Sequence, residues 1–320
     1  MKRREFILQG SAALAATALS SCDARPRWSD LRLVVGSDAT ELELAACEDA
    51  RSLFEQATST APPIVEDTEA FGRFDMLVGT AESSSNSSSI SNAHVPAVAG
   101  GFRVRTGETP KVVIAGHDAE GARNGLYAFM EHLGFRFFRD RDAIPELSGI
   151  VSLDARLEGE PAFRWRGDMI WDNYLGPRRY CASVWTEDDW ERTLLFMARN
   201  RMNFLEFYPP LEHVFAQVFP EARGLEDGSV WKSDVKHALA KKVLTRARSL
   251  GIHCMYVLSY GGFPEPVRAL FPRLEWRNGF LCAHQPELQE LTRRSWRALI
   301  DELGTDHWYA IRHRGEEEQV

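Results

Sequence analysis

Basic residues are in the minority in this sequence of 320 residues. Lys and Arg number 38 and Asp and Glu number 46, which gives a formal net charge of −8 and a pI of about 5.7. The sequence also lacks any stripe of basic side chains with interleaved aromatic rings. Both absences argue against a nucleic-acid-binding surface, and we expect no nucleic-acid partner.

Cysteine is scarce as well. Five are present, and the four beyond residue 22 are too widely spaced to predict a disulfide scaffold: Cys47, Cys181, Cys254 and Cys282. The pairs Cys282–His284 and His253–Cys254 lack zinc-ligand spacing, and no second pair completes either one. We therefore predict no metal site and no cofactor. Cys47 falls on a helical face and Cys254 in an apolar strand, so both are expected to be buried thiols.

Long apolar runs are absent too, and the apolar stretch near the N-terminus is too short to span a membrane. A basic start at residues 2–4 precedes an apolar run, interrupted by small residues, from Phe6 to Leu19. This pattern is typical of a secretory signal. Arg3 and Arg4 followed by Phe6 resemble a twin-arginine signal, which exports folded proteins. Residues 1–22 are therefore expected to be a signal segment outside the fold.

Residues 19–22, Leu-Ser-Ser-Cys, resemble the lipobox of bacterial lipoproteins. The resemblance implies that Cys22 is lipidated and becomes the mature N-terminus. The protein would then be exported to the periplasm or the cell surface and would meet the membrane only through its lipid anchor. A soluble secreted protein cut near residue 22 is the alternative.

The rest of the composition is that of a soluble globular protein, with 44% hydrophobic and 26% charged residues. The length suits two domains, and the pattern of elements changes near residue 157. We expect a small N-terminal domain over residues 23–157 and a second domain over residues 158–320.

The first domain alternates strand and helix patterns. They follow one another at residues 31–36, 41–58, 74–79, 102–115 (a hairpin) and 117–134. The serine-rich stretch at residues 83–89 has too little apolar surface to pack and is expected to be a loop. These patterns predict an α/β or α+β domain whose sheet carries helices on one side.

The second domain repeats a strand followed by a long helix. Strands are expected at residues 163–171, 203–208, 253–260 and 306–311, and helices at residues 188–200, 235–251 and 287–304. Thr186 and Asp189 have the spacing of a capping box for the first of these helices. The repeat predicts parallel strands and the first half of a (β/α)₈ barrel. A doubly wound sheet is the alternative, but no glycine-rich fingerprint follows any strand.

A resemblance to known enzymes begins at residues 112–138, VVIAGHDAEGARNGLYAFMEHLGFRFF. This stretch resembles the end of the small α/β domain that precedes the barrel in several glycoside hydrolase families. These include the family 20 hexosaminidases, the family 67 α-glucuronidases and the family 89 α-N-acetylglucosaminidases. In those enzymes this domain supports the barrel rather than taking part in the reaction.

Four segments of the second domain resemble family 89 in order and at compatible spacing. They are WERTLLFMARNRMNFLEF, PLEHVF, YGGFPEPVRALFP and ELGTDHWY, between residues 190 and 309. The resemblance implies an activity on α-linked N-acetylhexosaminides and implies that Glu212 and Tyr260 contact the sugar.

Residues 171–185, WDNYLGPRRYCASVW, instead resemble family 67 in part, which would imply a uronide substrate. We interpret this as common ancestry, with family 89 the closer of the two. The positions that match imply sugar contacts by Asp172, Asn173, Tyr180 and Trp185. Core packing is the alternative for Tyr180 and Trp185, and Asp168 is expected to make a hydroxyl contact beside Asp172.

The catalytic acid/base of family 89 follows the strand after Gly-Thr-Asp-His. An ungapped count from His307 places this glutamate on Glu316, although Gly315 replaces the asparagine that precedes it in the family. The alternative is a solvated acidic run formed by Glu316, Glu317 and Glu318.

Glycosidases of these families use two carboxyl groups, and the second would lie on a later strand. Residues 160–320 are fewer than the roughly 250 of a full barrel, so we expect a C-terminally truncated chain. Glu206 sits inside a strand, where packing or an ion pair explains it as well as catalysis does. The chain as given is therefore expected to have little glycosidase activity.

Three functional classes remain open. The first is a glycosidase of the α-N-acetylglucosaminidase type, with an α-glucuronidase as its variant. The second is a carbohydrate-binding lipoprotein without catalysis. The third is an interaction module in which a partner chain covers the open sheet edge.

Overall fold

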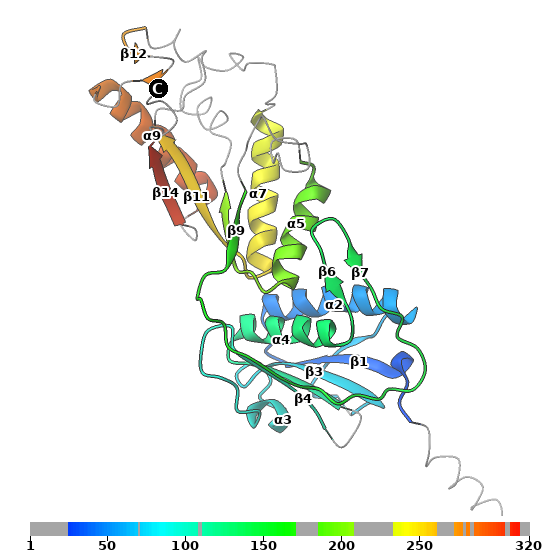
Figure 1. The fold of residues 1–320 in the computed structure, drawn as a ribbon. Coiled ribbons are helices and arrows are strands. Elements are labelled where there is room, and N and C mark those ends of the chain that lie inside the picture. Colours follow the sequence, from blue (N-terminus) through cyan, green and yellow to red (C-terminus); the bar gives the residue numbers. More distant parts are fainter. Residues whose placement is uncertain are drawn as a thin grey trace, which may run out of the picture. The chain divides into compact units, whose positions relative to one another are not determined.

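The computed structural model describes residues 25–69, 71–107, 111–170, 185–207, 233–260, 272–277, 280–281, 285–304 and 308–313. The chain forms two compact units, each with its own sheet (Figure 1). Unit 1 comprises Met1–Phe135 and Ile144–Glu160, and unit 2 comprises Arg136–Ala143 and Pro161–Val320.

Unit 1 is built on a six-stranded mixed sheet in the order β2-β1-β3-β5-β4-β8. Its strands are β1 (Leu31–Val35), β2 (Ile64–Glu66), β3 (Phe74–Thr80), β4 (Phe102–Thr106), β5 (Lys111–Gly116) and β8 (Arg156–Gly159). Strands β1, β2, β3 and β5 run parallel, and β4 is antiparallel to β5 and β8. All residues of β3 are buried, as expected for a central strand covered on both faces.

Two long helices, α2 (Glu41–Thr58) and α4 (Ala119–His132), lie together on one face of this sheet (Figure 1). A short 3₁₀ turn, η1 (Trp28–Asp30), leads into β1. Helix α4 begins at its cap Asp118, whose Oδ1 accepts from the backbone N–H of Gly121 at 2.7 Å. The chain leaves it at Gly134, where a φ of 106° favours glycine. The predicted α/β character of this unit is confirmed.

The serine-rich stretch after β3 is packed, and the prediction of an unpacked loop is wrong. It leads into α3 (Ser88–Ser91), which lies on the face of the sheet opposite α2 and α4 (Figure 1). Ser83, Ser84 and Ser87 are buried. The buried Ser84 Oγ has no hydrogen-bond partner among the described residues. Composition fails for Ser83 because a serine hydroxyl can be buried when polar partners satisfy it, without any apolar surface of its own.

Those partners come from the preceding strand and from α2. Ser83 Oγ donates to Glu43 Oε1 at 2.6 Å and accepts from the Thr80 backbone N–H at 2.9 Å. The close fit also needs a glycine in the neighbouring loop, because a Cβ on Gly36 would lie 1.8 Å from the Ser83 carbonyl oxygen. The buried Glu43 therefore joins the start of α2 to the serine-rich stretch.

Unit 2 contains a four-stranded parallel sheet in the order β14-β11-β10-β9. Its strands are β9 (Gly167–Ile170), β10 (Phe204–Phe207), β11 (His253–Tyr260) and β14 (Trp308–His313), and the helices between them are α5 (Glu187–Arg199), α7 (Ser233–Ser249) and α9 (Pro286–Leu303). Two short hairpins, β6 (Arg136–Phe137) with β7 (Asp142–Ala143) and β12 (Trp276–Arg277) with β13 (Phe280–Leu281), complete the described part of the unit.

The order of these strands in space is their order along the chain. A doubly wound sheet reverses its order at a switch point, so that alternative is wrong for the strands described. With right-handed crossovers, an unreversed order also places the connecting helices on one face of the sheet. The four strands and three connecting helices follow the β/α repeat, and the predicted first half of a (β/α)₈ barrel is confirmed.

Helix α5 follows its sequence pattern closely. Thr186 and Asp189 form the predicted capping box, with the Asp189 N–H donating to Thr186 Oγ1 and the Thr186 N–H donating to Asp189 Oδ2. The predicted apolar stripe is buried: Trp190, Leu194, Met197 and Ala198. The helix thus covers the sheet with one face and exposes its acidic first turn.

The two faces of this sheet differ in exposure. Leu205 and Cys254 pair in register and are 0% and 2% exposed, because the helices cover their face. The next register row points the other way and contains Met169 and Trp308, which are 48% and 47% exposed. We call this second face the inner face, since it corresponds to the interior of a barrel. Its described residues are Gly167, Met169, Phe204, Glu206, His253, Met255, Val257, Trp308 and Ala310, and Val257 among them is buried.

Candidate functional site

The four parallel strands of unit 2 all end at one edge of the sheet. Their last residues are Ile170, Phe207, Tyr260 and His313. In (β/α)₈ barrels, active sites are built at this edge from the loops that follow the strands. We therefore take the carboxyl edge of this sheet, with the segments that follow it, as the candidate site.

Most of the residues predicted for the site lie outside the described residues. These are Asp172, Asn173, Tyr180, Glu212 and Glu316, together with the expected lipid anchor Cys22. Tyr260 is the last residue of β11, and its backbone pairs in register with His313 of β14. The sheet therefore brings Tyr260 to the carboxyl edge, and the roles of all these residues stay predictions.

Trp185 directly precedes the N-cap of α5, at the same edge. Its ring meets the buried ring of Trp190 edge-on, with centroids 4.9 Å apart and an angle of 73° between the planes. Trp185 itself is only half-buried. The contact with Trp190 thus anchors the Trp185 ring against the core.

Asp168 lies on the other face of the sheet from Glu206, and the hydroxyl contact expected of it stays a prediction. It is the second residue of β9, and its register row contains Leu205 on the helix-covered face. Its carboxylate forms an ion pair with Arg139 of the β6–β7 hairpin. The parity of the strand explains the difference, because a shift of one residue moves a side chain to the other face of the sheet.

The strand register places Glu206 on the inner face of the sheet, which its sequence context does not indicate. It pairs in register with Met169 and Met255 on the inner face, one residue before the end of β10. Its neighbours in that row are apolar, so a carboxylate there is unusual and lies close below the carboxyl edge. Only the pairing register reveals this, and the sequence alone carries no signal that distinguishes it from a packing residue.

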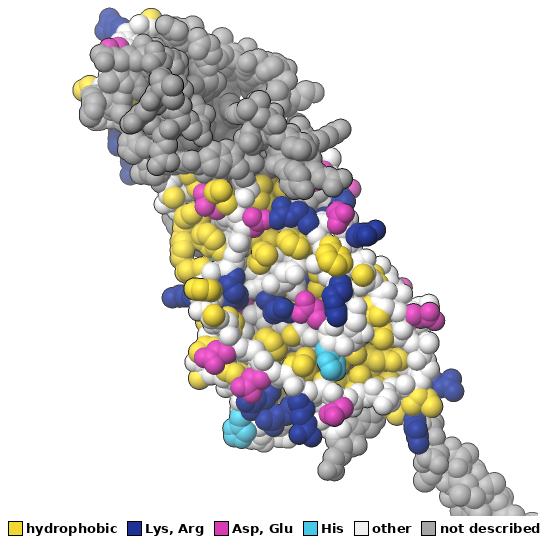
Figure 2. Space-filling view, viewed as in Figure 1, with side chains coloured by type: hydrophobic (Ala, Val, Ile, Leu, Met, Phe, Trp, Pro, Cys, Tyr) yellow, Lys and Arg dark blue, Asp and Glu magenta, His cyan; other side chains and the backbone are white. Residues whose placement is uncertain are grey.

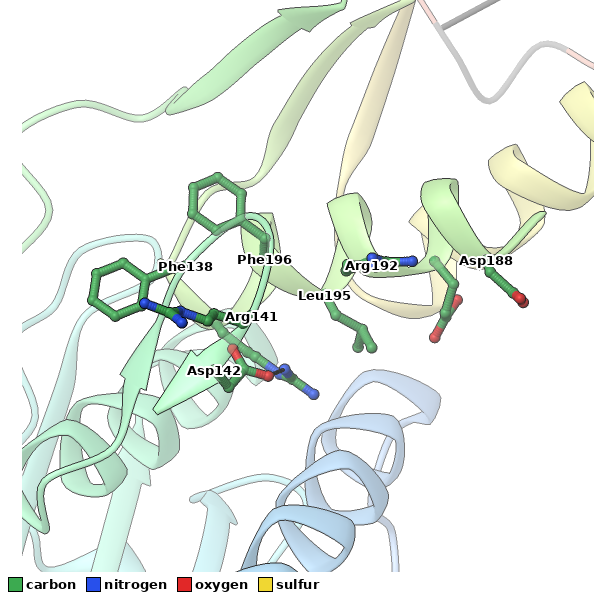
Figure 3. Close-up of a pocket in the computed structure, with 9 residues that line it drawn as sticks. Phe138, Arg141, Asp142, Asp188, Arg192, Leu195 and Phe196 are labelled. Atoms are coloured by element: carbon green, nitrogen blue, oxygen red, sulfur yellow. Dashed lines mark hydrogen bonds and ion pairs between the residues drawn. The ribbon is translucent and has the colours of Figure 1, made fainter. Parts of the chain in front are cut away.

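A separate hollow of about 430 Å³ lies along the outer stripe of α5, beside the β6–β7 hairpin (Figure 3). Two of its three carboxylates are used in ion pairs, Asp142 with Arg199 at 2.5 Å and Glu191 with Arg246 of α7 at 2.6 Å, and Asp188 is the third. These pairs fasten the hairpin and α7 to α5. The hollow runs along α5 from Asp188 in its first turn to Arg199 in its last, and we interpret it as a gap in that packing.

The two cysteines within the described residues are buried free thiols, as predicted. Burial raises the pKa of both the Cys47 and the Cys254 thiol to about 12. Neither is therefore suited to act as a nucleophile. Cys181 and Cys282 lie outside the described residues.

Other site types find no support in the part of the chain that the structure describes. No group of three or more His, Cys, Asp or Glu side chains there could hold a metal ion. None of the described helices is long and apolar enough to cross a membrane. Basic and acidic side chains are interspersed on the face shown in Figure 2.

No protein-family model and no curated protein matches this chain. Solved structures do match. The chain is similar to a β-N-acetylhexosaminidase from Bacteroides fragilis NCTC 9343, with 13% identity and a TM-score of 0.55 over 88% of this chain and 52% of that one. It is also similar to a mutant β-hexosaminidase from Streptomyces plicatus in complex with its product GlcNAc, with 16% identity and a TM-score of 0.54 over 87% and 53%.

A third similar structure is a GH138 enzyme that targets pectin rhamnogalacturonan II, with 14% identity and a TM-score of 0.53 over 88% of this chain and 30% of that one. The chain thus spans about half the length of the two hexosaminidases and about a third of the GH138 enzyme. At these identities the likeness concerns the fold. The fold of the chain is similar to that of part of these glycoside hydrolases.

Proposed function

We propose that this protein is an exported, glycoside-hydrolase-like protein of the α-N-acetylglucosaminidase type, which binds a terminal N-acetylhexosamine at the carboxyl edge of unit 2. The observation that carries the proposal is the match between fold and motif. The segments that resemble family 89 run through α5 into β10 and from the end of α9 into β14, which are the elements of the half barrel. They therefore resemble that family in the same part of the fold where such enzymes hold their sugar.

The choice of sugar has two sources of support. The resemblance to family 89 implies an N-acetylglucosaminide, and the similar Streptomyces plicatus enzyme is in complex with its product GlcNAc. The resemblance to family 89 is also what implies the α linkage, and the partial resemblance to family 67 leaves a uronide as the alternative. Asp172, Asn173, Tyr180, Trp185, Glu212 and Tyr260 are the proposed sugar contacts.

Catalysis is assigned to one carboxylate only. Glu316 follows the last residue of β14, His313, by three positions (316 − 313), so it is the proposed acid/base at the edge where strands deliver catalytic groups. Hydrolysis needs a second carboxyl group about 5–5.5 Å from it in a retaining enzyme or about 6.5–9.5 Å in an inverting one. We therefore propose sugar binding, and we expect hydrolysis only where a second carboxylate is supplied.

Titration of tryptophan fluorescence with N-acetylglucosamine tests the binding proposal. We expect a saturable change at millimolar sugar, and Trp185→Leu should weaken binding about 3–10-fold by removing the ring face. Trp28→Phe is the matched control, because Trp28 lies in unit 1 and should leave the response intact. A response to glucuronic acid alone would favour the α-glucuronidase alternative, and no response to either sugar would refute the proposal.

A further inference from the structure

A hollow of about 580 Å³ lies over strands β4 and β8 of unit 1, and we call it the β4–β8 hollow. Burial alternates along β4, so that Phe102 and Val104 face the side of the sheet that α4 covers, while Arg103 and Arg105 lie on the opposite face. The hollow sets three positive charges against one negative, on a chain whose formal net charge is −8. Its charged residues are Arg103, Arg105, Arg156 and Glu158.

Two neighbouring rows of this strand pair differ in their charges. In one row Arg103 faces Glu158 across the antiparallel pair, and the two side chains form an ion pair. In the next row on the same face Arg105 faces Arg156. Like charges directly opposite each other destabilise a sheet, so the second row costs stability where the first contributes it.

No acidic side chain among the described residues neutralises the second row. Arg105 has no ion pair there, and Arg156 has only Asp154 at 4.0 Å, with side chains that are 88% and 89% exposed. Such an exposed pair contributes little. Protection of a sheet edge would account for Arg156 on the outer strand β8, but not for Arg105, because β4 pairs with strands on both sides. The row therefore offers two guanidinium groups to an anion from outside the chain.

We propose that the β4–β8 hollow binds a uronic acid residue of an acidic glycan, with its carboxylate on Arg105 and Arg156. Guanidinium groups bind a planar carboxylate through paired, charge-assisted hydrogen bonds. The two rows are two residues apart along the strands, or about 7 Å. This spacing is comparable to the length of a uronic acid from its carboxylate to its far hydroxyl groups. Arg103 can then donate to those hydroxyl groups, and Glu158 can accept from them.

A glycan fits this hollow better than a simple anion does. The row of Arg103 and Glu158 supplies a donor and an acceptor that inorganic sulfate or phosphate would leave unused, and the fold of the chain is similar to that of part of several glycoside hydrolases. The site uses residues of unit 1 only, so it goes beyond the sugar proposed at the carboxyl edge and stands if that sugar is wrong. It would hold the chain on an acidic polysaccharide without taking part in hydrolysis.

Isothermal titration calorimetry of the full chain with trigalacturonic acid tests the inference. The fully methyl-esterified trisaccharide is the matched ligand, since it keeps the sugar rings but lacks the carboxylate charges. We expect saturable binding of the acid and at least about 10-fold weaker binding of the ester. Binding of the acid should also weaken as NaCl rises from about 0.05 to 0.5 M, because both arginines are exposed to screening. Equal affinity for acid and ester would overturn the inference.

Arg105→Gln and Arg156→Gln should each weaken binding of the acid about 10-fold, because each removes one guanidinium group from the carboxylate. Arg51→Gln is the matched control, since Arg51 lies on α2, is 46% exposed and does not line the hollow. Trp185→Leu should leave this binding unchanged, which separates the site from a uronide bound at the carboxyl edge. Binding that persists when both arginines are replaced, or that is lost in Trp185→Leu, would overturn the proposed site.

Thermal unfolding separates ligand binding from a structural role of the two arginines. Because their charges repel each other, neither Arg105→Gln nor Arg156→Gln should lower the unfolding midpoint of the free protein. Trigalacturonic acid should raise the midpoint of the wild type and not that of the double variant. Sulfate that raises the wild-type midpoint equally at the same concentration would indicate a general anion site and overturn the uronate. If a variant fails to fold, the comparison of acid and ester on the wild type still decides the inference.

Discussion

Replacing Glu43 with alanine is expected to destabilise unit 1 by about 3 kcal/mol. The Glu43 side chain is fully buried, and its carboxylate accepts from Thr40 N at 2.7 Å, Thr40 Oγ1 at 2.8 Å and Ser83 Oγ at 2.6 Å. Alanine leaves these donors without their acceptor and breaks the capping box of α2. Each buried group left without a partner costs about 1–3 kcal/mol, and loss of a helix cap costs about 1 kcal/mol.

Cys47 provides a probe for unit 1 alone. It lies one turn along α2, is fully buried, and has a pKa raised to about 12, chiefly by burial and then by Glu43 and Glu48. Its thiol should therefore react with maleimide only when unit 1 opens. Pulse labelling across a urea gradient, read at Cys47 by mass spectrometry, gives the unfolding midpoint.

The midpoint should fall strongly for Glu43→Ala and less for Glu43→Gln, because the Ser83 hydroxyl can rotate to accept from the new amide. Glu48→Ala is the control, since that side chain is 60% exposed and pairs only with the neighbouring Arg51 among the contacts described. Equal midpoints for Glu43→Ala and Glu48→Ala would contradict the structural role given to the buried carboxylate.

Replacing Cys22 with alanine is expected to move the protein from the membrane fraction to the soluble fraction. A lipid-modified cysteine with two or more acyl chains gives stable anchoring, at about 0.8 kcal/mol for each buried CH₂. The rest of the chain offers no substitute among the described residues, where no helix could span a membrane. We therefore expect nearly all of the wild-type protein in the membrane fraction and nearly all of the Cys22→Ala protein in the soluble fraction.

Fractionation of cells that express each form, followed by immunoblotting, measures this effect. Cys47→Ala serves as the control, because Cys47 is a buried thiol of unit 1 and should leave the wild-type distribution unchanged. If wild type and Cys22→Ala are equally soluble, the lipid anchor is wrong and the soluble secreted form is favoured.

Local patterns predicted most of the framework. The apolar stripe of α5, its capping box at Thr186 and Asp189, and the glycine that ends α4 all act within one or two helical turns, so the sequence displays them directly. The barrel-like order of unit 2 followed from the repeat of strand and long helix. These features need no knowledge of which residues meet across the fold.

The features that were missed depend on distant partners. Ser83 is buried because the carboxylate of Glu43, 40 positions away, accepts a hydrogen bond from its hydroxyl, and composition cannot display such a bond. The β6–β7 hairpin belongs to unit 2 because Asp142 pairs with Arg199, 57 positions away. The faces of Asp168 and Glu206 are fixed by strand register, which is a property of the sheet and not of either segment.

The candidate site was predicted chiefly by resemblance to a family. Among its residues, Trp185 is the one whose side chain the structure describes, and its contact with Trp190 could not be predicted from helical spacing because Trp185 precedes the helix. The other contacts come from loops after the strands, where sequence patterns carry little information about geometry.

Sugar binding at the carboxyl edge of unit 2 is tested most directly by hydrogen–deuterium exchange with and without saturating N-acetylglucosamine. Slower exchange is predicted from Trp185 into the first turn of α5 and at the carboxyl ends of β10 and β11. Exchange in unit 1 and in the hairpin beside the α5 hollow should not change. Protection confined to that hairpin or to unit 1, or no protection anywhere, would contradict the account.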